Sequence, residues 1–208
     1  MVKLYYTPTS CGASSFICAY VKGLKMDCEV VDLMTHKTES GIDFYSINPK
    51  GNVPTIVLDD GTVLNENISC LEYIADQPGY SLAPGRDSNE RYKVTQLLSF
   101  LSSELHASIG LCFNPMSKET PIRQFVKSVF DKKMDYLQKH IIKNNTYAYG
   151  NVFTIVDAYL HIILSWTGYV NINLADYPVA ERYFNGIKDL QFVKDARHRM
   201  ASIPSTTC

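Results

Sequence analysis

A single thiol stands where a strand is expected to give way to a helix. Cys11 lies in the stretch "SCGAS", between the apolar run "KLYY" at 3–6 and the helix-like stretch "SSFICAYVKGL" at 14–24. The first N–H groups of a helix have no partner within it and form the positive end of its dipole, so they favour a thiolate. We therefore expect the pKa of Cys11 to lie below its ordinary value. The spacing leaves a buried structural cysteine equally open.

Ser14 occupies the position that a second cysteine holds in a CxxC redox pair. A thiol without such a neighbour can form a mixed disulfide with another molecule but cannot resolve it within the chain. The pattern therefore favours a partner that is itself a small thiol. The other cysteines show no CxxC or clustered spacing, so we expect reduced thiols and no metal site. They are Cys18, Cys28, Cys70, Cys112 and Cys208.

Two further stretches are suited to the backbone of a peptide-like ligand. Pro54 begins a predicted strand without an N–H for the ladder, which favours a turn or a cis bond and leaves the backbone of Val53 free to pair. Glu66 and Asn67 precede a predicted helix, where free N–H groups would hold a carboxylate and Glu66 an ammonium group. An edge-strand proline and a capping asparagine are the simpler interpretations. Together with Cys11, these stretches match what glutathione, a thiol tripeptide, would need.

The composition is that of an ordinary globular protein. The chain has 208 residues, of which 46% are hydrophobic and 20% charged, and its formal net charge is −1. This balance offers no basic surface for nucleic acid. The first residues lack the apolar core of a secretory signal, and the most apolar segment is too short to span a bilayer. We expect a cytoplasmic protein with no nucleic-acid or membrane partner.

The pattern of expected elements divides the chain into two domains. Residues 1–78 alternate between strands and helices, residues 79–87 form a linker rich in Pro, Gly and Ser, and residues 88–208 are helical throughout. The fold class is therefore α/β plus all-α. The expected strands are 3–6, 28–33, 54–60 and 62–65, the last two joined by a tight turn at Asp60-Gly61. The expected helices are 14–24, 40–48, 68–76, 90–111, 122–142, 154–170, 179–187 and 192–198.

The helix expected at 154–170 is apolar nearly all round, which is typical of the buried central helix of a bundle. Thr154 begins it, and Asp157 follows three positions later. A hydroxyl that accepts from the N3 amide and an acid that reaches back to the cap form a capping box, here with Asp in place of the usual Glu. We therefore interpret these two residues as a folding element.

Several stretches, in this order and at these spacings, resemble the cytosolic glutathione S-transferases. They include "KLYYTPTSCGAS", "NPKGNVPTIVLDDGTVLNE", "SELH" and "FTIVDAYL", and they are most similar to the bacterial beta class, which carries a cysteine in its site. The resemblance covers nearly the whole chain. It implies a thioredoxin-like N-terminal domain, an all-helical C-terminal domain and a homodimer. It also implies glutathione as co-substrate, no metal, and a role in detoxification.

The resemblance assigns functions to five residues of the first domain. Cys11 would contact the glutathione sulfur, as a catalytic residue. Val53 and a cis Pro54 would pair with the cysteinyl backbone of glutathione. Glu66 and Asn67 would hold its γ-glutamyl end. The family usually has Ser after the acid, so Asn67 predicts weaker glutathione binding than in its relatives. An Asn67→Ser change is expected to tighten that binding.

The resemblance assigns the remaining site residues as follows. His36 falls on a glutathione-binding position where the beta class tends to have lysine, and Ala107 stands where a lysine is often found. The resemblance therefore implies that one or two positive charges near the thiolate are missing. His106 matches a histidine that lines the thiol site and is expected to be catalytic. Ser99, Ser103 and Glu104 are expected to bind glutathione, the last two on a stretch that reaches the partner subunit's glutathione.

These observations predict an enzyme that conjugates glutathione to small hydrophobic electrophiles. Glutathione-dependent thiol-disulfide exchange or peroxidase activity through Cys11 is a further expectation. The alternative is a protein of the same fold that binds ligands or partners and has little catalytic activity. Retention on immobilised glutathione, with or without turnover, separates the two.

Overall fold

The computed structural model describes residues 1–202 and 206–207, and these residues form two compact units. The first unit comprises Met1–Arg86 together with the segment from Leu190 onward, and the second comprises Asp87–Asp189. Helix α8 (Gln191–Ser202) belongs to the first unit, where it packs against α1 (Gly12–Lys22), although we expected residues 88–208 to form one domain. The physical reason is an apolar stripe on α8, Val193, Ala196 and Met200, whose members are all buried.

A mixed sheet forms the base of the first unit, and β1 lies at its centre. Leu4 of β1 pairs with Cys28 of β2 in parallel on one side and with Ile56 of β4 in antiparallel on the other. The strand order is β3-β2-β1-β4-β5, and β6 also pairs with β2. The strands are β1 (Lys3–Tyr6), β2 (Asp27–Asp32), β3 (Lys37–Thr38), β4 (Thr55–Val57), β5 (Val63–Asn65) and β6 (Thr206–Thr207).

The hairpin between β4 and β5 confirms the predicted turn. The Leu58 N–H donates to the Thr62 carbonyl at 2.9 Å, and Gly61 has φ +85°, a conformation that glycine adopts without strain. The predicted helix at 40–48, in contrast, is only a 3₁₀ turn at Phe44–Ser46. Asp43 caps this turn through the Tyr45 N–H, at 3.1 Å, and Pro49 follows closely, so the turn does not extend into a helix.

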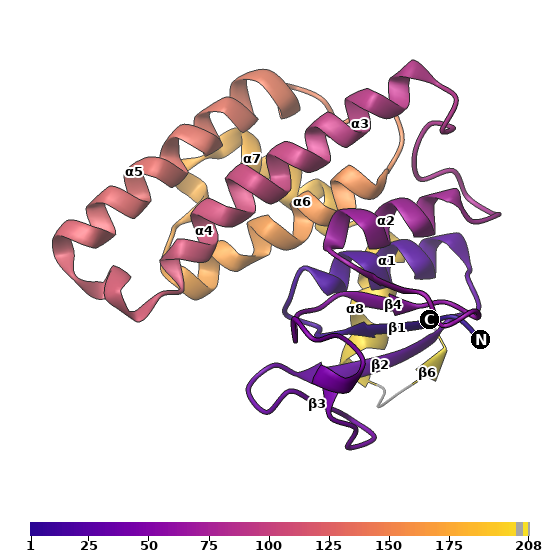
Figure 1. Cartoon of the computed structure of the whole chain (residues 1–208). Coiled ribbons are helices and arrows are strands. Elements are labelled where there is room, and N and C mark those ends of the chain that lie inside the picture. The colour runs from indigo at the N-terminus through magenta and orange to yellow at the C-terminus, as the bar shows by residue number, and fades with distance from the viewer. Residues whose placement is uncertain (203–205, 208) are drawn as a thin grey trace. The chain divides into compact units, whose positions relative to one another are not determined.

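Helices α1 and α2 (Asn67–Asp76) pack side by side over the sheet (Figure 1). Gly23 ends α1 in a left-handed conformation, with φ +68°. The fully buried side chains of Ile17, Leu71 and Ile74 come from these two helices, and that of Ile56 comes from the sheet below them. Two predicted site residues stand at the N-terminal ends of these helices, Cys11 before α1 and Glu66 before α2.

The second unit is a bundle of helices, as predicted. Its elements are α3 (Asn89–Phe100), α4 (Ala107–Cys112), α5 (Thr120–Tyr136), α6 (Ile155–Ser165) and α7 (Pro178–Lys188). A π-helical stretch at Leu101–His106 joins α3 to α4, and a second one at Leu137–Ile142 extends α5. All residues from Ile155 to Leu164 are buried, so α6 is the expected central helix.

Asp157 forms the predicted capping box and holds several elements of the second unit together. Its carboxylate accepts hydrogen bonds from the Thr154 N–H at 2.8 Å and the Thr154 hydroxyl at 2.9 Å. It also accepts from the Ala148 N–H at 2.7 Å and the Tyr183 hydroxyl at 2.6 Å. Burial raises the pKa of Asp157 to about 6, while these donors favour the ionised form.

Four cysteines are free thiols, namely Cys11, Cys18, Cys70 and Cys112. Cys28 is disulfide-bonded, so the prediction of reduced thiols is wrong for this residue, and Cys208 lies outside the described residues. Within the described part of the chain, no helix is long and apolar enough to cross a membrane. Those residues also contain no cluster of three or more His, Cys, Asp or Glu that could hold a metal ion.

Candidate active site

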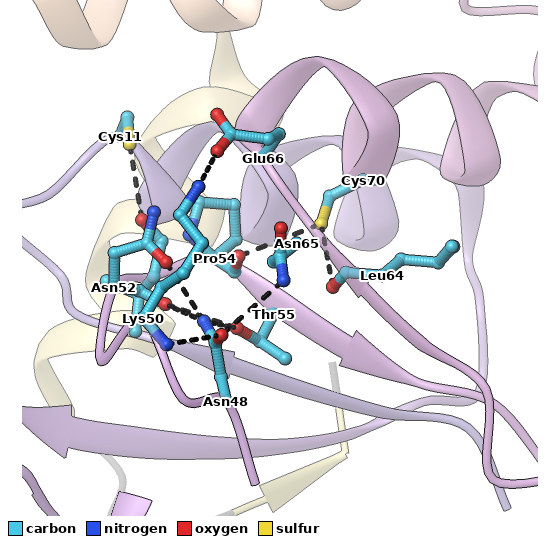
Figure 2. A network of polar contacts seen from close by, with 11 residues as sticks. Cys11, Asn48, Lys50, Asn52, Pro54, Thr55, Leu64, Asn65, Glu66 and Cys70 are labelled. Atoms are coloured by element: carbon cyan, nitrogen blue, oxygen red, sulfur yellow. Dashed lines mark hydrogen bonds and ion pairs between the residues drawn. The ribbon is translucent and has the colours of Figure 1, made fainter. Parts of the chain in front are cut away.

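The thiol of Cys11 lies at the first turn of α1 and faces the loop that enters β4 (Figure 2). Its Sγ donates to the carbonyl oxygen of Val53 at 3.5 Å. The Val53-Pro54 peptide bond is cis, as one of the two sequence interpretations expected. The structure therefore brings three predicted site residues together although 42 positions separate Cys11 from Val53.

The environment of Cys11 favours the neutral thiol. Burial raises the pKa of Cys11 to about 12, and the negative charge of Glu66 adds to the increase. The N–H groups of Cys11 and Gly12 act in the opposite direction but are outweighed. The prediction of a lowered pKa is therefore wrong for this structure, because desolvation of the sulfur exceeds the effect of the helix-end amides.

Glu66 stands at the N-terminus of α2, in a strained backbone conformation with φ +74°. Its carboxylate forms an ion pair with the ammonium group of Lys50 (Figure 2). Both side chains are more than half exposed, so the pair can exchange partners with a ligand at little cost. Lys50 adds a positive charge to the site that the sequence comparison with the beta class did not anticipate.

A buried amide, Asn48, shapes the loop that carries Lys50. The Nδ2 of Asn48 donates to the Asn52 carbonyl at 2.8 Å and to the Thr55 hydroxyl at 3.0 Å. Its Oδ1 accepts from the Lys50 N–H at 3.1 Å (Figure 2). These bonds fix the turn that delivers both the cis peptide bond and the lysine.

The Asn67 side chain points into the protein and not toward solvent, and the residue is 6% exposed. Its Nδ2 donates to the Ser14 hydroxyl at 3.2 Å, and its Oδ1 accepts from the Ser15 hydroxyl at 3.4 Å. Ser14 in turn donates to the Cys11 carbonyl at 2.6 Å. This chain of hydrogen bonds ties the start of α2 to the first turn of α1, so only the backbone N–H of Asn67 remains to serve a ligand.

His36 lies in the loop between β2 and β3, with φ +51°. Its ring packs against Tyr45, with the ring centroids 4.5 Å apart. The His36 ring also lies close to Gly51, the residue after Lys50. A Cβ atom added at Gly51 would lie only 2.9 Å from the His36 Nδ1. The Nδ1 is buried and has no hydrogen-bond partner among the described residues. A direct contact of His36 with glutathione stays a prediction.

His106 ends the first π-helical stretch of the second unit. Its Nδ1 is hydrogen-bonded to the Tyr159 hydroxyl at 2.6 Å, and its ring packs edge-on against Trp166 at 4.7 Å. Burial lowers the pKa of His106, so the ring is neutral at pH 7. The hydrogen bond to Tyr159 leaves Nε2 as the ring nitrogen that a substrate could use. π-helical turns are frequent at functional sites.

Ser99, Ser103 and Glu104 line one groove of the second unit, between α3, the π-helical stretch and α5. The groove has a volume of about 810 Å³. Both serine hydroxyls donate to carbonyl groups of their own helix, each at 2.8 Å, and Glu104 pairs with Lys133 at 2.6 Å. The structure thus groups three of the predicted residues on one face of this unit. His106 does not line the groove.

Comparison with known proteins decides the family. Residues 13–77 match the model for "Glutathione S-transferase, N-terminal domain". Over 196 residues the chain is 33% identical to glutathione S-transferase GstA of Escherichia coli O157:H7. The matched region covers 94% of this chain and 96% of that protein. The chain belongs to the glutathione S-transferase family.

Solved structures place this transferase near the bacterial beta class. A sphingomonad glutathione S-transferase in complex with glutathione is 34% identical and has a TM-score of 0.89, covering 97% of this chain and 100% of its own. The beta-class enzyme of Sphingomonas chungbukensis is 33% identical, with a TM-score of 0.88 and the same coverage. The predicted fold, family and enzyme class are therefore confirmed.

Sequence reasoning missed two residues of the transferase's first unit. Lys50 lies 16 positions before Glu66, and only the turn built by Asn48 brings the two charges together. Ser14 was noted as the replacement for a second cysteine, but its bond to Asn67 spans 53 positions and carries no local signal. In both cases the two partners are far apart in the sequence, and only the tertiary fold brings them into contact.

The buried position of Asn67 predicts a different effect of Asn67→Ser from the one expected from the sequence. An Asn67→Ser side chain is too short to reach both Ser14 and Ser15, so the buried Ser15 hydroxyl loses its partner and the Ser14 hydroxyl keeps only the Cys11 carbonyl. We expect the free energy of unfolding to fall by about 1–2 kcal/mol, with no gain in glutathione affinity. Urea unfolding and calorimetric titration with glutathione measure the two quantities.

Asn89→Ser provides the matched control, because Asn89 is also the first residue of a helix but is exposed. It should change the free energy of unfolding by less than about 0.5 kcal/mol. Tighter glutathione binding by Asn67→Ser at unchanged stability would contradict the positioning role and restore the side chain to the ligand clamp.

Proposed function

We propose that this transferase binds glutathione in its first unit and transfers it to a small hydrophobic electrophile. The observation that carries the proposal is the set of Cys11, Val53 and cis Pro54 beside the N-terminus of α2, where Glu66 stands. A family member of the same fold has been solved with glutathione bound. The arrangement has the parts that a tripeptide with a thiol, a free amine and two carboxylates requires.

The backbone of Val53 would pair with the cysteinyl residue of glutathione as a strand does. Its carbonyl now accepts the Cys11 thiol proton, so a ligand that donates to this carbonyl competes with Cys11 for it. Unpaired N–H groups in the first turn of α2 would hold the γ-glutamyl carboxylate, and Glu66 its ammonium group. Lys50, once released from Glu66, is available to the second carboxylate.

Glutathione's own sulfur would be the nucleophile in the transfer. Cys11 is a poor candidate at neutral pH because burial raises its pKa to about 12. The N–H groups of Cys11 and Gly12, which favour a thiolate at the Cys11 sulfur, would instead stabilise a glutathione thiolate bound beside it. We include His106 as a second catalytic residue, since it is neutral at pH 7 and its Nε2 is the ring nitrogen that is not bonded to Tyr159.

Retention on immobilised glutathione, followed by an assay with chlorodinitrobenzene, tests the proposal. The wild type should be retained, should elute with free glutathione and should form the conjugate. Glu66→Gln should weaken glutathione binding about tenfold, because it removes one charge-assisted contact. Retention without turnover of any electrophile would support the binding-protein alternative. A wild type that is not retained would contradict both functions.

We further propose that the transferase is a cytoplasmic homodimer that acts in detoxification. The exposed groove that Ser99, Ser103 and Glu104 line offers a concave face for a second copy. Sedimentation equilibrium should give twice the mass of one chain, and Ser103→Arg should shift the equilibrium toward the monomer by obstructing the groove. A wild type with the mass of one chain at working concentration would contradict the dimer.

A further inference from the structure

The hydroxyl group of Ser10 caps the start of α1, one residue before the thiol of Cys11. The Gly12 N–H donates to the Ser10 Oγ at 3.1 Å, and the Ala13 N–H donates to the Ser10 carbonyl at 3.1 Å. A side-chain oxygen that accepts from an N–H of the first turn is how a capping residue satisfies a helix end. Ser10 therefore does the capping, although Cys11 is the residue that directly precedes the helix.

Toward the N–H groups of α1, the Ser10 hydroxyl acts only as an acceptor. Its own proton goes to the Thr7 carbonyl at 2.9 Å, and the Thr7 hydroxyl is in turn anchored to the Val31 carbonyl at 2.6 Å. The hydroxyl comes close because residue 12 has no side chain, since a Cβ atom added at Gly12 would lie 3.2 Å from the Ser10 Oγ. Ser10 thus accepts a hydrogen bond from this end of α1 and has no proton left to give to a sulfur atom.

The Gly12 N–H is also one of the two donors that favour a thiolate at Cys11, the other being the N–H of Cys11 itself. The next N–H groups are used within the chain, since Ala13 donates to the Ser10 carbonyl and Ser14 donates to the Cys11 carbonyl at 3.0 Å. A thiolate can therefore gain the full strength of the Gly12 N–H only by taking it from the Ser10 hydroxyl.

We propose that Ser10 is a positioning residue that restrains the reactivity of a sulfur at this turn, because its hydroxyl holds the Gly12 N–H. A hydrogen bond to a thiolate is stronger than one to a hydroxyl, but breaking the existing bond takes away part of the gain. The same competition would apply to the thiolate of bound glutathione, and this extension rests on the proposed function.

The charged and titratable groups around the sulfur are separate from this hydrogen bond. At the start of α2, Glu66 disfavours the thiolate and is paired with Lys50. From the same helix comes the thiol of Cys70, which is neutral because burial raises its pKa to about 12. Arg197 of α8 donates to the Pro8 carbonyl at 3.2 Å. Because a change of the serine alters none of these groups, a change in ionisation would report the hydroxyl itself.

Ultraviolet absorbance of the thiolate tests the inference on the full chain without glutathione. Each variant is measured against the same variant carrying Cys11→Ala, so that the difference contains only the ionisation of Cys11. Ser10→Ala should raise the thiolate fraction at pH 10 about tenfold, as for a pKa lowered by about one, because it frees a charge-assisted donor. Alkylation of Cys11 by iodoacetamide should become about threefold faster, since a thiolate of lower pKa is also a weaker nucleophile.

Two further variants separate the hydroxyl from the shape of the turn. Ser10→Thr keeps the accepting oxygen and should behave like the wild type. Ser10→Gly removes the oxygen but is well tolerated at a helix cap, so it should show the same increase as Ser10→Ala even if the latter folds poorly. Ser46→Ala is the matched control and should change nothing, because the exposed Ser46 also donates to a carbonyl three positions before it, that of Asp43 at 2.6 Å.

A purely structural role of the cap predicts lower stability without a larger thiolate fraction. An unchanged thiolate fraction in both Ser10→Ala and Ser10→Gly, or an equal increase in Ser10→Thr, would overturn the inference. Retention of the wild type on immobilised glutathione is measured separately. Its failure would contradict the proposed function and would leave the result at Cys11 standing.

Discussion

Replacing Cys11 by alanine is expected to abolish glutathione-dependent disulfide exchange, leaving only the uncatalysed rate. Cys11 is the thiol beside the predicted peptide-pairing edge, whereas Cys18 and Cys70 are fully buried. Its thiolate would attack one sulfur of oxidised glutathione, form a mixed disulfide and release the other glutathione as a thiolate. Ser14 cannot displace the bound glutathione, so a second, reduced glutathione must do so. Conjugation should survive the change, because glutathione supplies that nucleophile.

The raised pKa of Cys11 predicts how exchange depends on pH. Only the thiolate attacks, and below the pKa its fraction rises tenfold for each pH unit. With a pKa of about 12, the rate of mixed-disulfide formation should keep rising between pH 7 and pH 10. A free cysteine with a pKa of about 8.5 would instead level off within that range.

Mass mapping after mild oxidation with oxidised glutathione locates the adduct. One glutathione should be attached at Cys11, and added reduced glutathione should remove it. Cys112→Ala is the control, since Cys112 is another half-buried thiol and should not affect the exchange rate. An adduct on Cys112 or Cys208 with Cys11 unmodified would show that Cys11 is a packing residue, and exchange through it would then be excluded.

Replacing Asp157 by alanine is expected to lower the free energy of unfolding by about 3–5 kcal/mol. The carboxylate is fully buried and accepts from two N–H groups and two hydroxyls. Removing it leaves these donors unsatisfied in the interior, where each costs about 1–3 kcal/mol if water cannot reach it. The start of α6 and its connection to α7 through Tyr183 would be affected most.

Urea unfolding followed by circular dichroism measures this loss. Tyr183→Phe removes one of the four donors and should cost about 1 kcal/mol. Asp135→Ala removes an exposed carboxylate that pairs with Lys139 at 3.0 Å, and it should change stability by less than about 0.5 kcal/mol. A loss below about 1 kcal/mol in Asp157→Ala would show that water replaces the carboxylate.

The elements that depend on neighbouring residues could be predicted from the sequence. The Asp60-Gly61 turn, the helix that Thr154 and Asp157 begin and the strand at 3–6 all follow from short patterns of turn residues, caps and apolar spacing. The cis bond before Pro54 also has a local cause, because proline reduces the preference for the trans form. The short strands β3 and β6, two residues each, have no pattern long enough to detect.

The roles of individual site residues were decided only by the tertiary structure. The sequence places Asn67 just before a helix and the structure makes it the first residue of α2, but whether its amide faces a ligand or Ser14 depends on how α2 packs against α1. The pKa of Cys11 has the same origin. The sequence shows the helix-end amides that lower it, whereas the desolvation that raises it comes from residues brought together by folding. Short sequence patterns thus determined which residues lie at the site. Packing between distant segments determined how exposed and how charged their side chains are.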